Sequence, residues 1–150
     1  MIAKRAPILF AWLISLTLSA CHNQANHAER AKPQIAITAD SVFIRRSPAA
    51  DIRIAANTQE GQPGNQVELR IDDLLLPLQP RQQSDLANAF NQWRQLRQHL
   101  IDSGKLTAQR RSTHVQAPPE LASAQARLLQ DIPELAPYRQ SFTNLQATWH

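Results

Sequence analysis

The apolar side chains of this sequence change their spacing near residue 72, and this change limits the fold to a class that combines strands and helices. Before residue 72, apolar residues alternate with polar or small ones, which is the pattern of half-buried strands. After residue 85, they recur every three to four residues, which is the pattern of amphipathic helices. The sequence therefore predicts an α+β domain with the strands first and the helices second.

Four short segments between about residues 35 and 72 carry the alternating pattern. Breaks at residues 39–40, 46–50 and 57–66 separate them, and the last break contains two of the three glycines. We expect these segments to form a small antiparallel sheet of three to four strands with one face open to water. The alternating apolar residues are Ile35, Ile37, Val42, Ile44, Ile52, Ile54, Val67, Leu69 and Ile71.

Two or three amphipathic helices are predicted after the sheet. The first runs from about residue 81 to 103, because Pro80 and Ser84 favour a helix start and Gly104 stands where a C-terminal cap belongs. The others cover about residues 119–131 and 134–148.

The last two helices are expected to meet at a bend, because Pro133 and Pro137 interrupt the backbone hydrogen bonds of a helix. A seven-residue repeat of large apolar side chains runs through both. It predicts a stripe packed on the first helix or on the sheet, with an intermolecular coiled coil as the alternative. The repeating residues are Leu121, Leu128, Leu135, Phe142 and Trp149.

The first 20 residues have the composition of a signal peptide. Lys4 and Arg5 precede an apolar run from Ala6 to Leu18, which is too short to span a bilayer. The run ends at Leu18-Ser19-Ala20-Cys21, and Cys21 is the only cysteine of the 150 residues. An unpaired thiol is a liability in an oxidising compartment, so this cysteine calls for a chemical role.

This arrangement resembles the lipobox of bacterial lipoprotein precursors, which reads Leu, a small or polar residue, Ala or Gly, and Cys. The resemblance implies that diacylglycerol is attached to the sulfur of Cys21, that the chain is cleaved before it, and that the new amino group is acylated. Acyl chains on one residue then form a stable membrane anchor. His22 in place of an aspartate implies the periplasmic face of the outer membrane. The alternative is a secreted protein with an incidental cysteine.

Cleavage leaves a polar tether at residues 21–34 and a single α+β domain at residues 35–150. The formal net charge falls from +4 to +2 because Lys4 and Arg5 are removed. A charge this small, without a basic run longer than two residues, does not predict nucleic-acid binding.

The sequence contains no recognisable catalytic motif, so we expect a protein that is not an enzyme, with no cofactor and no metal. A glycine-rich phosphate loop, HExxH and GxSxG are all absent. Asp72 and Asp73 are adjacent, and neighbours on a strand point to opposite faces. A turn or a helix cap is therefore favoured over an acid and base pair.

Arg97 is the residue that breaks the apolar pattern of the first helix. On a helical wheel it lies beside Trp93 and Leu100. A guanidinium in an apolar stripe must reach solvent, pair with a carboxylate or hold an anionic ligand. Two interpretations follow. Either the stem of Arg97 covers apolar surface, or Phe90 and Trp93 line a cleft in which Arg97 holds an anionic amphiphile.

Residues 35–103 also resemble YggN-like periplasmic proteins in the order of short strands, an IDDLLLPLQPRQQ connector and a helix. That resemblance implies no activity. We therefore expect a lipid-anchored cell-envelope lipoprotein that acts as a non-catalytic scaffold or accessory protein. Its expected partners are the membrane, through acyl chains on Cys21, and envelope proteins or an anionic amphiphile. The alternative is a periplasmic amphiphile-binding module that uses the Trp93 and Arg97 helix face.

Overall fold

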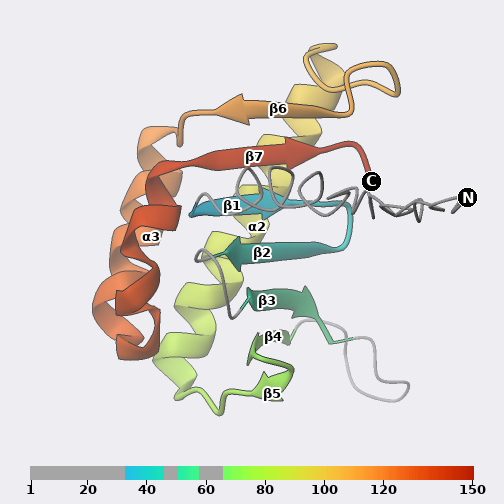
Figure 1. Ribbon diagram of the computed structural model, residues 1–150. Helices are drawn as coiled ribbons and strands as arrows, with labels where there is room; N and C mark the ends of the chain where they lie inside the picture. The colour runs from blue at the N-terminus through green and yellow to red at the C-terminus, as the bar shows by residue number, and fades with distance from the viewer. Residues whose placement is uncertain (1–32, 46–50, 58–65) are drawn as a thin grey trace, which may run out of the picture.

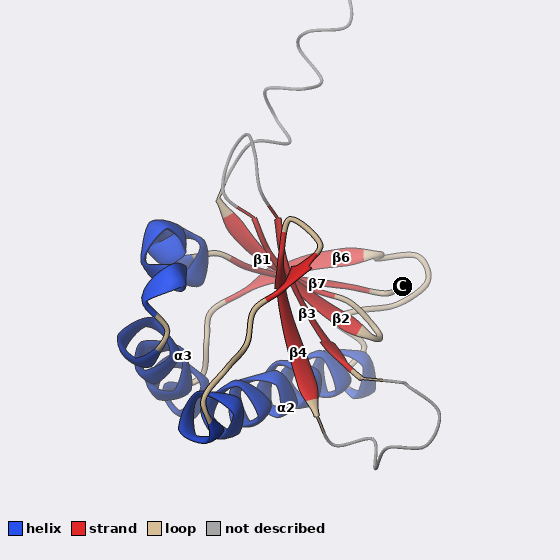
Figure 2. Cartoon of the chain, turned by 90° about the horizontal axis from the view of Figure 1, so that it is seen from below, coloured by secondary structure: helices blue, strands red, loops and turns tan. Residues whose placement is uncertain are grey.

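A seven-stranded sheet covered on one face by helices forms the domain (Figures 1 and 2). The computed structural model describes residues 33–45, 51–57 and 66–150. The elements in chain order are β1 (Gln34–Ile37), β2 (Ser41–Arg45), β3 (Asp51–Ala56), β4 (Val67–Ile71), β5 (Leu74–Leu75), α2 (Pro80–Asp102), β6 (Ser112–Val115), α3 (Pro119–Asp131), the 3₁₀ helix η2 (Pro133–Thr143) and β7 (Leu145–Thr148).

The prediction of an antiparallel sheet with three to four strands is wrong, although the α+β class is correct. The strand order is β5-β4-β3-β2-β1-β7-β6. Neighbouring strands pair in antiparallel fashion except β1 and β7, which are parallel and align Ile35 with Leu145. The chain therefore returns to the sheet twice after α2, which the sequence pattern did not indicate.

The predicted third helix at residues 134–148 is present only in part, as a 3₁₀ helix that ends at Thr143. This segment begins with η2 and ends with β7. Pro133 starts η2 and Pro137 lies inside it, and neither proline has an N–H to donate to an α-helical ladder. In β7, Leu145 and Ala147 are buried while Gln146 is only partly so, which is the alternation of a strand.

Helices α2 and α3 lie where the apolar spacing placed the first two helices. The buried face of α2 carries the predicted stripe, including Leu86, Phe90 and Trp93. Gly104 follows α2 with a φ of 70°, a left-handed conformation that favours glycine at a helix end. Within the part of the chain that the structure describes, no helix is long and apolar enough to cross a membrane.

The core lies between the inner face of the sheet and the helices. The seven-residue repeat of the sequence contributes directly to it, because Leu121, Leu128, Leu135 and Phe142 are all at most 7% exposed. Trp149, the last residue of the repeat, packs against a smaller cluster with Leu100, Leu106 and Ala147. The apolar stripe therefore packs in the core of its own domain, as the first of the two interpretations predicted.

Candidate functional site

Two of the three residues predicted to form a ligand face are part of the core. Phe90 is 2% exposed and Trp93 is fully buried. The Trp93 ring packs against the Phe142 ring, with 6.4 Å between the ring centroids. Neither Phe90 nor Trp93 can therefore form the wall of a cleft that is open to a ligand.

Arg97, the third residue, binds the backbone at the end of β7. Its Nε donates to the carbonyl oxygen of Thr148 at 2.8 Å, and its Nη2 donates to that of Trp149 at 2.5 Å. Burial lowers the pKa of the Arg97 guanidinium from its ordinary value, and the positive charge of Arg94 lowers it further. Arg97 thus fastens α2 to the C-terminal strand.

The hairpin between β4 and β5 contains the non-glycine residues with a positive φ in the described ranges. Asp72 has a φ of 49° and Asp73 a φ of 63°. Two consecutive residues in the left-handed region are typical of the type I′ turn, whose twist matches that of the flanking strands. The prediction of a turn at this aspartate pair is confirmed.

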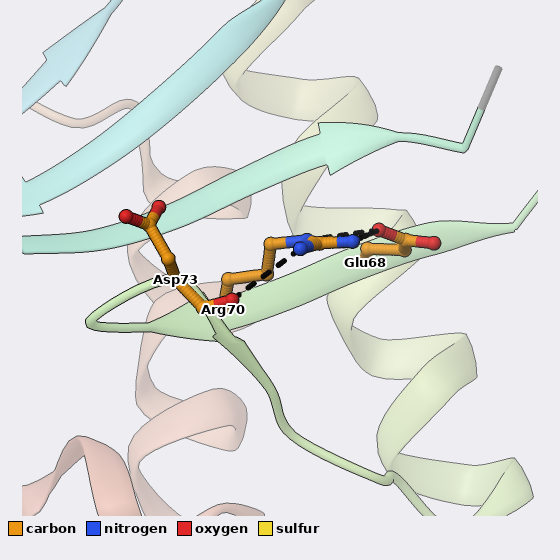
Figure 3. Close-up of polar contacts among 3 residues, drawn as sticks. All are labelled: Glu68, Arg70 and Asp73. Carbon is orange, nitrogen blue, oxygen red and sulfur yellow. Dashed lines mark hydrogen bonds and ion pairs between the residues drawn. The ribbon is translucent and has the colours of Figure 1, made fainter.

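The side chain of Arg70 connects β4 to this turn (Figure 3). Its Nε and Nη2 donate to the same carboxylate oxygen of Glu68 at 3.2 and 3.1 Å. Its Nη1 donates to the backbone carbonyl of Asp73 at 3.3 Å. The carboxylate of Asp73 points away from Arg70, so the backbone alone makes this contact (Figure 3).

Strand β5 presents two leucines at the edge of the sheet, which we call the leucine edge (Leu74 and Leu75). Leu74 is 75% exposed and Leu75 is 55% exposed, and they are the exposed large apolar side chains of the described residues. β5 is the outermost strand of the sheet, so no strand of the described residues pairs with the other side of its backbone. An apolar edge of this kind is suited to pair with an extended segment of another protein.

The leucine edge was not predicted as a site, because the segment LLLPLQP that contains it has the composition of an apolar connector. The available signal was three leucines directly after an aspartate pair that favours a turn. Two paired residues were too short a strand to show an alternating pattern.

The remaining predicted features give no second site. Cys21, the signal peptide and residues 22–32 of the tether lie outside the residues that the structure describes. Among the described residues, no group of three or more His, Cys, Asp or Glu side chains is placed to hold a metal ion. No protein-family model, curated protein or solved structure matches this chain.

Proposed function

We propose that this protein is a lipid-anchored accessory protein of the bacterial cell envelope, which holds a partner protein at the leucine edge. The observation that carries the anchor is the sequence Leu18-Ser19-Ala20-Cys21 behind a short apolar run, with the lone thiol of the chain at its end. Thioether attachment explains why the chain has one cysteine and where it stands.

The β4–β5 hairpin supports binding as the activity of the domain. Left-handed backbone at a residue other than glycine has a free-energy cost, and such conformations concentrate at functional sites. Here Asp72 and Asp73 adopt it directly before Leu74 and Leu75, and Arg70 holds the turn in place. The partner is an extended protein segment that pairs with β5 and covers its two leucines with apolar side chains.

The amphiphile-binding alternative has less support. It requires an apolar wall beside Arg97, and the two side chains assigned to that wall are buried in the core.

Photo-crosslinking in intact cells tests the partner. A photoreactive amino acid at Leu75 is expected to give one or a few discrete protein adducts after irradiation, identified by mass spectrometry. The same amino acid at Gln130, an exposed position on α3, is the matched control and is expected to give none of them.

Two results would contradict the partner proposal. One is an identical adduct pattern from Leu75 and Gln130. The other is a Leu75 adduct made only with lipid, which would place the leucine edge in the membrane surface. Replacing Leu74 and Leu75 with serine is expected to remove the adduct of a probe at Leu76 while changing the free energy of unfolding by less than about 0.5 kcal/mol per site.

A further inference from the structure

A surface groove of about 370 Å³ lies between α2 and the turn that joins β1 to β2. We call it the arginine groove. Its volume is within the range of small-molecule sites in proteins. Its lining residues are Thr38, Ala39, Asn91, Arg94, Gln95, Arg97 and Gln98.

The helix side of the groove is a polar face of α2. Residues 91, 94, 95 and 98 follow one another at intervals that place them on the same side of a helix. Three of these four side chains are primary amides and one is a guanidinium. The face is therefore rich in hydrogen-bond donors, and Arg97 adds a second guanidinium.

Neither guanidinium of the groove makes an ion pair with an acidic side chain in the part of the chain that the structure describes. Arg94 makes no ion pair there, and its guanidinium carbon lies 5.8 Å from the centroid of the Phe90 ring. Asp40 and Asp102 stand one residue after Ala39 and one helical turn after Gln98, and each has another partner, while the backbone oxygen of His150 accepts a hydrogen bond from the N–H of Ala39 in the groove at 3.3 Å. Asp40 accepts a hydrogen bond from the Thr38 hydroxyl at 3.1 Å, and Asp102 accepts one from the Gln98 amide at 2.8 Å.

The guanidinium of Arg97 is held in one orientation by backbone carbonyls. Its Nε and Nη2 bind the carbonyls of Thr148 and Trp149, which leaves its Nη1 donors without a described partner. Because β1 and β7 are parallel neighbours, both strands end on the same side of the domain, where Thr38 of the groove follows β1. A fixed guanidinium loses little side-chain entropy on binding an anion.

We propose that the arginine groove binds a small polar molecule through one phosphate or carboxylate group. Arg94 and Arg97 hold the anionic group by charge-assisted hydrogen bonds. Asn91 and Gln95 donate to or accept from hydroxyl or amide groups of the same molecule. This site is separate from the leucine edge and does not depend on the proposed partner.

An NMR titration of the purified full chain with inorganic phosphate, and separately with acetate, tests the groove. Sodium chloride at matched ionic strength gives the baseline for charge screening. We expect saturable shifts of the side-chain amide signals of Asn91 and Gln95 with at least one of the two anions. Saturation by phosphate alone assigns a phosphate group, and saturation by acetate assigns a carboxylate.

Matched variants separate the site from general attraction. Arg94→Gln is expected to weaken anion binding about tenfold, the loss of one charge-assisted hydrogen bond. Arg127→Gln removes the same charge from an exposed position on α3 and is expected to change binding less than about twofold. Equal weakening by both variants would overturn the proposal, as would the absence of saturable shifts with either anion.

Discussion

Arg97 illustrates at the residue scale how a charge in an apolar stripe is accommodated. The sequence left three outcomes open: solvent, a carboxylate or an anionic ligand. The structure adds a fourth partner, because two backbone carbonyls at the end of β7 accept hydrogen bonds from the guanidinium. No pattern along α2 indicates this contact, since the two carbonyls lie more than 50 positions further along the chain.

Replacement of Arg97 tests this structural role. Arg97→Gln is expected to lower the free energy of unfolding by about 1–2 kcal/mol, because hydrogen bonds to a charged, partly exposed group are lost. Arg97→Lys restores only part of that loss, since an ammonium lacks the planar fork that binds two carbonyls. Urea denaturation measures both, with Arg127→Gln as the control. Unchanged stability of Arg97→Gln would contradict the role.

At the scale of single elements, the β4–β5 hairpin combines a costly turn with an exposed strand. Asp72 and Asp73 occupy conformations that glycine adopts more easily. The short strand β5 then leaves its leucines in solvent. Type I′ turns accept aspartate at the first of these positions and prefer glycine at the second, so the exposed leucines are the feature of this hairpin that supports a binding role.

Replacing Asp73 with glycine is expected to stabilise the domain, because glycine adopts a positive φ at lower cost. Asp73→Gly creates an Asp-Gly pair, which type I′ turns prefer, and is expected to raise the free energy of unfolding by about 0.5–1 kcal/mol. The contact of Arg70 survives, because the carbonyl of Asp73 accepts it.

Gly104→Ala is the comparison variant, and it is expected to lower the free energy of unfolding where Asp73→Gly raises it. Gly104 has a φ of 70° and open space where a Cβ would stand, so only the backbone conformation opposes alanine. The free energy of unfolding is expected to fall by about 1 kcal/mol, and urea denaturation measures this variant and Asp73→Gly side by side. Destabilisation by Asp73→Gly would show that the turn is not strained.

The elements that the sequence predicted well are those with many residues in one periodic pattern. The 23 residues of α2 and the 13 of α3 show clear helical spacing. The missed strands β5, β6 and β7 have two to four residues each, and β6 (STHV) is held by its pairing with β7 rather than by an apolar alternation of its own. The spacing of Leu135, Phe142 and Leu145 fits a helix as well as the observed structure.

The candidate sites were less predictable than the fold. Phe90 and Trp93 were correctly placed on the apolar face of α2, but a helical wheel does not distinguish a cleft from a core. The arginine groove joins α2 to the β1–β2 turn, and only the folded chain brings them together.

At the scale of the whole molecule, the position of β1 suits an anchored protein. β1 is the first described strand, yet it lies inside the sheet between β2 and β7 (Figure 1). The backbone of β1 pairs with β2 along Gln34 to Ile37 and with β7 along Ile35 to Ile37. The proposed anchor at Cys21 would therefore pull on a strand that the sheet holds from both sides.

The lipid on Cys21 is the central claim, and intact-mass spectrometry of the protein purified from bacterial membranes tests it most directly. We predict a mature chain that begins at Cys21 and carries a diacylglyceryl thioether and an acylated amino group. A Cys21→Ser variant should remain uncleaved and lack these groups. A mature chain that begins at another residue, or an unmodified Cys21, would contradict the account.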